Sequence, residues 1–212
     1  MSVRYDCSDP AWRRRGLDQA VRALGDGELV VLPTDTGYAL TVDAFRPDAT
    51  AALSRAKGRE VASPPLFVAD LRMLDGVASR VGDAARDLVR AWWPGPISLV
   101  THAQPTLDWN VGSAITVRVP LHPVALEVLS RSGPLLAVGV GVGEQVRTAT
   151  RAQELLGESV LVYLDAGTAP EQPPSTVVDA RVEPLRVLRE GAVPAEELAA
   201  WVPADPSPEV SA

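Results

Sequence analysis

Short apolar runs rich in valine and leucine alternate along this chain with segments whose apolar residues recur every three or four positions. Runs of the first kind predict strands, and segments of the second kind predict helices. Asp9-Pro10 supplies an N-cap and a proline at the first helical position, and the helix that it starts is expected to reach Gly25. Because several expected strands follow one another without an intervening helix, we predict a single α/β domain with a twisted, mixed parallel and antiparallel sheet flanked by helices.

The expected elements cover most of the chain. We expect strands at residues 28–32, 39–44, 66–69, 97–101, 114–119, 135–142, 160–164, 176–179 and 185–188, and helices at residues 10–25, 48–57, 71–78, 82–93, 123–130, 148–156 and 194–201. An N-terminal helical segment over residues 1–24 should pack on a domain that spans residues 10–201. Residues 203–212 are small, polar and proline-containing, so we expect a disordered tail there.

Composition narrows the class of protein. The 212 residues include 20 Lys+Arg and 27 Asp+Glu, which gives a formal charge of −7. Of the residues, 46% are hydrophobic, which is enough to form a core without disulfides or a structural metal. Cys7 has no cysteine to pair with, and with His102 and His122 it makes no zinc set unless carboxylates join. We therefore expect a cytoplasmic location, no resident metal and no membrane contact, since no apolar run approaches the ~20 residues that span a bilayer. The acidic total argues against a general nucleic-acid binder but leaves a local cationic cleft open.

Two polar segments stand out against the apolar pattern. The segment from Thr34 to Tyr38 places hydroxyl groups and the Asp35 carboxylate between two expected strands, where it is either a turn held by its own side chains or part of a site. Lys57 and Arg59 lie at the end of an expected helix. Cations there interact favourably with the helix dipole, and the same two side chains could also bind phosphate or carboxylate groups.

Later segments leave similar alternatives. Thr116 and Arg118 share one face of an expected strand, which is either solvated or part of a site, and Arg189 follows another strand in the same way. The glycine-rich run from Gly139 to Gly143 is a poor dinucleotide fingerprint, because Glu144 stands where that motif needs glycine. Its backbone N–H groups are still suited to an anion.

Taken in order, six motifs resemble the YrdC-like family of threonylcarbamoyl-AMP synthases, also called YrdC/YciO-like. The family's P-T-[DE]-T-x-Y-G-L, K-x-R, W-P-G-P, V-R-x-P, S-T-[IV]-V-D and L-R-x-G motifs are matched by Pro33–Leu40, Lys57–Arg59, Trp93–Pro96, Val117–Pro120, Ser175–Asp179 and Leu188–Gly191. Each motif is modest alone, but six in the same order are specific.

The resemblance implies an enzyme that joins L-threonine, bicarbonate and ATP into threonylcarbamoyl-AMP and pyrophosphate, for the threonylcarbamoyl-adenosine of tRNA. ATP is then a substrate accompanied by Mg²⁺, and downstream tRNA-modifying proteins and RNA are the expected partners. The resemblance assigns phosphate and carboxyl groups to Lys57 and Arg59, the reacting carboxyl and phosphate region to Arg118, and the nucleotide to Arg189. The other expected binding residues are Thr36, Tyr38, Thr116, Gly139, Gly141 and Ser175.

One motif of the family is altered. Its S-A-N-x-S-G loop aligns with the segment from Gly139 to Glu144, so two hydroxyls and an amide are absent and a carboxylate is added. Gly37, Ala39 and Glu60 also depart from the usual residues. The alternative hypothesis is therefore a catalytically impaired relative that binds nucleotide or double-stranded RNA, and a related enzyme that uses another amino acid also fits.

Overall fold

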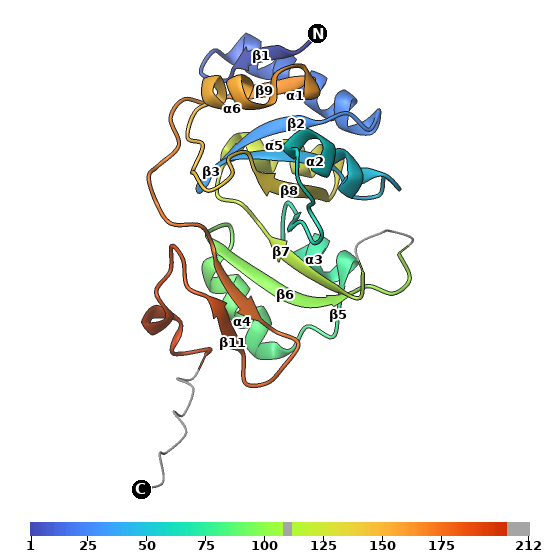
Figure 1. Ribbon diagram of the computed structural model, residues 1–212. Helices are drawn as coiled ribbons and strands as arrows, with labels where there is room; N and C mark the ends of the chain where they lie inside the picture. Colours follow the sequence, from blue (N-terminus) through green and yellow to red (C-terminus); the bar gives the residue numbers. More distant parts are fainter. Residues whose placement is uncertain (108–111, 203–212) are drawn as a thin grey trace, which may run out of the picture.

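One mixed sheet runs through the whole molecule and organises it (Figure 1). The computed structural model describes residues 1–107 and 112–202. The elements are β1 (Val3–Asp6), α1 (Pro10–Gly25), β2 (Val30–Thr34), β3 (Gly37–Asp43), α2 (Ala49–Lys57), β4 (Leu66–Phe67), α3 (Leu71–Val77), β5 (Ala78–Ser79), α4 (Asp83–Trp92), β6 (Ile97–Ala103), β7 (Ala114–Arg118), α5 (Pro123–Ser132), β8 (Leu135–Gly139), α6 (Ala149–Leu156), β9 (Val162–Asp165), β10 (Thr176–Asp179) and β11 (Arg186–Arg189), with short 3₁₀ turns η1 (Gly157–Ser159) and η2 (Ala195–Leu198).

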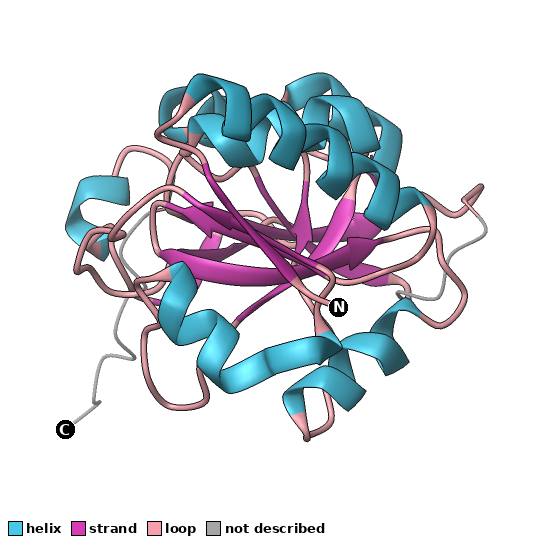
Figure 2. Ribbon diagram, turned by 90° about the horizontal axis from the view of Figure 1, so that it is seen from above, coloured by secondary structure: helices cyan, strands magenta, loops and turns pink. Residues whose placement is uncertain are grey.

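The sheet is mixed, as predicted. Its strand order is β1-β9-β2-β3-β8-β4-β7-β6-β10-β11, and β5 pairs with β6 outside this path. The pairs β1/β9, β2/β9, β4/β7 and β6/β10 are parallel, whereas β2/β3, β3/β8, β4/β8, β6/β7 and β10/β11 are antiparallel. Helices cover the sheet on both sides (Figure 2). The predicted fold class is therefore confirmed.

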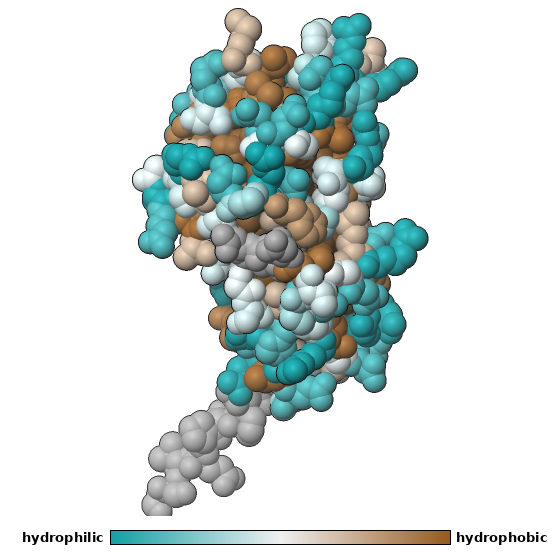
Figure 3. All heavy atoms as spheres, turned by 90° about the vertical axis from the view of Figure 1, so that its right-hand side faces the viewer, coloured by the Kyte–Doolittle hydropathy of each residue, from teal (hydrophilic) through white to brown (hydrophobic). Residues whose placement is uncertain are grey.

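Alternating residues of the strands pack into two separate hydrophobic clusters. Val30 lies in the cluster that includes residues of α1 and α5, whereas the next residue, Val31, lies in the cluster that includes residues of α2, α4 and α6. The start of α1 follows the sequence pattern, since the Asp9 carboxylate accepts hydrogen bonds from the N–H groups of Ala11 and Trp12. Apolar and polar side chains are interspersed on the face that Figure 3 shows, while Leu32, Leu53 and Ile97 are among the side chains that are fully buried.

Three local expectations differ from the structure. The segment expected to be helical over residues 1–24 also contains β1, whose partner β9 is far away in sequence, so local pattern alone carries no signal for that pairing. The two-residue strand β5 was not expected either. The helix expected at residues 194–201 is only the 3₁₀ turn η2.

The C-terminal segment and the helices bear on two further expectations. The expected disordered tail at residues 203–212 lies outside the described residues. Within residues 1–107 and 112–202, no helix combines the length and apolar character needed to cross a bilayer.

Candidate functional site

The tight turn between β2 and β3 is the centre of the candidate site. Thr34 pairs with Gly37 across the hairpin, which leaves Asp35 and Thr36 as its two loop residues. The Thr34 hydroxyl donates to the Gly37 carbonyl at 2.6 Å and accepts from the Thr36 N–H at 3.2 Å. Gly37 has φ of +110°, and a Cβ there would lie 2.9 Å from the Val146 carbonyl oxygen, so the turn needs glycine. The turn is thus held by its own side chains and still presents polar groups.

A buried ion pair anchors this turn to β7. Arg118, 4% exposed, donates from Nη2 to both carboxylate oxygens of Asp35, at 2.6 and 2.7 Å. Its Nη1 donates to the Thr36 hydroxyl at 2.8 Å, and its Nε donates to the Gly95 carbonyl at 3.1 Å. The Leu121 N–H also donates to Asp35, at 3.0 Å. Arg118 therefore lies neither on a solvated face nor free in a cleft, because most of its donors are used inside the protein.

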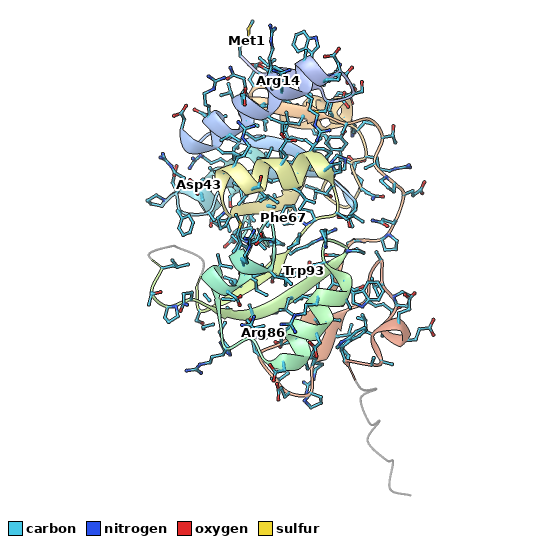
Figure 4. The ribbon with its side chains drawn as sticks, turned by 180° about the vertical axis from the view of Figure 1, so that it is seen from behind. Met1, Arg14, Asp43, Phe67, Arg86 and Trp93 are labelled. Atoms are coloured by element: carbon cyan, nitrogen blue, oxygen red, sulfur yellow. The ribbon has the colours of Figure 1, made fainter. Side chains whose placement is uncertain are left out.

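Burial dominates the electrostatics of this pair. Burial lowers the pKa of Arg118. The adjacent Asp35 carboxylate raises this pKa, and the nearby Arg189 lowers it. The guanidinium carbon of Arg118 also lies 5.9 Å from the centre of the Phe67 ring, which is labelled in Figure 4. A charge pair so thoroughly removed from water costs free energy unless the hydrogen bonds of both partners are satisfied. Here Nη2 of Arg118 contacts both Asp35 oxygens, and the Leu121 N–H gives the carboxylate a further donor.

Two late motifs reach the same region. Arg189, at the end of β11, is exposed and donates from Nη2 to the Ser175 carbonyl at 2.7 Å. The hydroxyls of Ser175 and Ser98 are 2.8 Å apart. The N–H of Thr176, the residue after Ser175, donates to the Pro96 carbonyl at 2.9 Å, and the preceding Gly95 carbonyl accepts from Arg118, so this segment adjoins the ion pair that holds the hairpin turn. The structure therefore brings together Thr36, Arg118, Ser175 and Arg189.

Lys57 forms a second group next to the first. It is the single lysine of the whole sequence, is 9% exposed, and donates to the carbonyls of Gly139 and Gly141 at 2.8 and 2.9 Å and also to that of Val140. Burial lowers the pKa of Lys57, and the neighbouring Arg59 lowers it further. Arg59 itself is exposed, with one hydrogen bond at 3.4 Å to the Glu60 carbonyl among the described residues.

The two groups adjoin through β3 and β8. Gly139 pairs with Ala39 in the sheet, and the Val140 N–H donates to the Tyr38 carbonyl at 3.1 Å. The Tyr38 N–H donates to the Val146 carbonyl at 2.8 Å. Both ends of the glycine-rich loop, residues 139–146, therefore lie beside the hairpin turn.

The glycine-rich loop offers backbone donors in place of side chains. Among the hydrogen bonds of residues 1–107 and 112–202, none is donated by the N–H groups of Gly141, Val142 or Gly143. The Glu144 carboxylate, which the sequence places where an anion should bind, is 3.2 Å from Nη2 of Arg151. Its charge is thus paired, and the loop can still receive an anion on its free N–H groups.

Two predicted site residues lie elsewhere. The Tyr38 hydroxyl donates to the Gly167 carbonyl at 2.7 Å and accepts from the Ala166 N–H at 3.1 Å, and burial raises its pKa, so it fastens β3 to the chain beyond β9. Thr116 lines a separate pocket of about 190 Å³ together with Thr50 and Ser63. Among the described residues, neither of these two side chains is hydrogen-bonded to Asp35 or Thr36.

Sequence reasoning missed two contributors. Asp35 lies inside a motif that we singled out, but only the fold shows that it pairs with Arg118. Gln172, in a proline-rich segment, donates from its carboxamide to the Asp35 carbonyl, and no sequence pattern marks it. Within the part of the chain that the structure describes, no group of three or more His, Cys, Asp or Glu side chains could hold a metal ion.

Known proteins resemble this chain over most of its length. A family model named Sua5_yciO_yrdC and described as "Telomere recombination" matches residues 22–191. A Mycobacterium tuberculosis protein named "Putative threonylcarbamoyl-AMP synthase" is 42% identical over 205 residues, which cover 94% of each chain. A Pyrococcus abyssi protein named threonylcarbamoyl-AMP synthase is 29% identical over 181 residues, and the match covers 82% of this chain but only 53% of that relative.

Solved structures agree with the sequence matches. Pyrococcus abyssi Sua5 complexed with L-threonine superposes with a TM-score of 0.84 at 26% identity, covering 96% of this chain and 61% of that one. Escherichia coli YciO superposes with a TM-score of 0.81 at 22% identity, covering 93% of this chain and 100% of that one, which shows the shared fold.

Proposed function

Because this chain belongs to the Sua5/YciO/YrdC family, we propose that it is a threonylcarbamoyl-AMP synthase, forming threonylcarbamoyl-AMP and pyrophosphate from L-threonine, bicarbonate and ATP. The observation that carries the proposal is the close superposition on Pyrococcus abyssi Sua5 complexed with L-threonine. The product would serve the threonylcarbamoyl-adenosine modification of tRNA in the cytoplasm, through tRNA-modifying proteins that receive it.

The reaction needs positioning and charge neutralisation more than a nucleophilic side chain. The threonine amine first combines with bicarbonate to give a carbamate and water. A carbamate oxygen then attacks the α-phosphorus of ATP, and the bond to the leaving pyrophosphate breaks. Negative charge gathers on the phosphates in this step, so fixed cations and N–H donors supply most of the acceleration.

The structure suggests distinct roles for the cations. Arg59 and Arg189 are exposed, and Arg59 has no carboxylate partner within 4.0 Å among the described residues, so these two are suited to phosphate and carboxylate groups. Lys57 would order the glycine-rich loop so that its free N–H groups receive phosphate. Arg118 would hold Thr36, whose hydroxyl contacts the substrate, because most of its own donors are already engaged.

Magnesium belongs to the substrate in this proposal. Mg²⁺ prefers phosphate oxygens and water, and needs only one or two protein ligands when it arrives with a nucleotide. We therefore propose that it enters with ATP, so removal of Mg²⁺ by a chelator should stop pyrophosphate release without unfolding the protein.

Pyrophosphate release by the purified protein tests the proposal. The full chain should release pyrophosphate from ATP only when L-threonine and bicarbonate are both present, and Lys57→Ala should abolish the release. Arg55→Ala is the matched control, since Arg55 lies on the same helix, is exposed and pairs with Asp48 at 3.6 Å. Release that ignores threonine would refute the synthase.

The altered loop keeps a second function open. The glycines at 139, 141 and 143 supply no hydroxyl or amide, which favours a relative that binds nucleotide or double-stranded RNA without making the adenylate. ATP binding that neither needs threonine nor leads to pyrophosphate would support this second function.

A further inference from the structure

A strap formed by residues 166–175 crosses from β9 to β10 along the left of Figure 1. Three of its carbonyls accept hydrogen bonds from side chains that flank the candidate site. Tyr38, on β3, donates to Gly167 at 2.7 Å. Gln145, in the glycine-rich loop, donates to Pro170 at 3.2 Å, and Arg147, just after that loop, donates to Ala169 at 2.8 Å. The strap is therefore fixed against the hairpin and the loop.

One side chain of the strap reaches the hairpin turn. Gln172 is half-buried and donates from Nε2 to the Asp35 carbonyl, which directly precedes Thr36 in the turn. Across the described residues, this is the one hydrogen bond that its carboxamide makes. A carboxamide carries two N–H donors and an acceptor oxygen, so one donor and the oxygen are left for a ligand.

Two positions of the glycine-rich loop cannot carry such a group in the present loop conformation. A Cβ on Gly141 would collide with the carbonyl oxygen of Glu144, and Gly143 has φ of +74°. Side chains at these positions would therefore require a different loop conformation. In this chain the carboxamide beside the turn comes from the strap instead.

We propose that Gln172 is a substrate-binding residue, whose carboxamide hydrogen-bonds the amino-acid substrate at the β2–β3 turn. This inference rests on the proposed function and identifies which substrate the strap recognises. The group is neutral and lies beside the closed Asp35–Arg118 pair, so it binds a carboxylate or hydroxyl without disturbing that pair. ATP is bound by the cations and the loop, not by Gln172.

Calorimetric binding of L-threonine and steady-state kinetics, both on the full chain, test the assignment. Gln172→Ala and the nearly isosteric Gln172→Met should each weaken threonine binding and raise the threonine KM by about 10- to 100-fold, the usual effect of one lost hydrogen bond to a charged group. The ATP KM should change by less than about twofold, and the melting temperature should stay that of the wild type.

Glu171→Ala is the matched control, because Glu171 is the neighbouring strap residue and its exposed carboxylate pairs with Arg147 at 2.9 Å instead of reaching Asp35. An unchanged threonine affinity in both Gln172 variants would overturn the inference, as would an equal loss in Glu171→Ala or a rise confined to the ATP KM. A wild-type protein that binds no threonine would also overturn it. If the wild type binds threonine but releases no pyrophosphate, the proposed function fails, while the Gln172 comparison still decides the inference.

Discussion

Removal of Asp35 tests whether the buried ion pair holds the site together. In Asp35→Ala, the Arg118 guanidinium would stay buried at 4% exposure but lose the carboxylate that it contacts at 2.6 and 2.7 Å. Breaking a buried pair by removing one partner typically costs 3–5 kcal/mol, so we expect a loss of about 4 kcal/mol in the free energy of unfolding. For a domain of this size that corresponds to a melting temperature lower by roughly 8 to 16 °C.

The assay is urea unfolding at neutral pH, followed by circular dichroism and intrinsic fluorescence together. Asp87→Ala is the control, because Asp87 pairs with Arg90 at 2.9 Å but both side chains are 61% exposed. Exposed pairs of this kind contribute at most about 1 kcal/mol, so this variant should unfold nearly like the wild type.

A double-mutant cycle separates the pair from its surroundings. Arg118→Met alone should also destabilise the fold, and the double variant Asp35→Ala/Arg118→Met should lose at least about 2 kcal/mol less than the sum of the two single losses. If Asp35→Ala loses no more stability than Asp87→Ala, or if the two single losses simply add, the reasoning about the buried pair is wrong.

Three further predictions concern the loop, the lysine and acid stability. Gly139→Ser should fold like the wild type because a Cβ there meets nothing within 4 Å, whereas Gly141→Ala should lower the melting temperature because its Cβ collides with the Glu144 carbonyl; equal melting curves would contradict this. Because Lys57 is the only lysine, the NMR signal of its ε-carbon can be followed selectively as the pH is raised. We expect the pKa from this titration to lie below the ordinary lysine value of 10.5. A pKa at or above 10.5 would show that the ammonium is not buried against the loop carbonyls. Hydrogen bonds from Arg181 hold the pKa of Asp179 below its usual 3.8, so this carboxylate adds stability above about pH 4 that is lost as the pH falls through the lowered pKa. Asp179→Asn should therefore be less stable at pH 7 and show a flatter loss of stability in acid, and an unchanged acid profile would argue against the pair.

Local sequence patterns predict most of the helices and strands of the fold. The Asp9-Pro10 cap and the spacing of apolar residues located α1, and the runs around Val30 and Leu135 located central strands, because both signals depend on neighbours in sequence. β1 was missed because four residues acquire strand structure only through pairing with β9, far along the chain. Pairing of this kind has no local signal.

For the candidate site, too, the sequence identifies some features and misses others. Lys57, Arg59, Arg118 and Arg189 were identifiable as cations in unusual places and as parts of ordered motifs. Their roles were not, because the contacts that define them join segments far apart in sequence, such as Arg118 with Asp35 or Lys57 with the loop carbonyls. Arg118 shows this clearly. The alternation of side chains along a strand predicts that it lies on a solvated face or in a site, whereas the fold buries it in an ion pair with Asp35.

Product detection with labelled substrates tests the central claim most directly. The purified chain would be incubated with ATP, L-threonine and ¹³C-bicarbonate, and the mixture analysed at once by mass spectrometry for an adenylate that contains threonine and one labelled carbon. The account predicts this adenylate together with an equal amount of pyrophosphate, and neither without threonine. ATP that binds but yields no labelled adenylate would contradict the synthase assignment and leave a nucleotide-binding relative of the family.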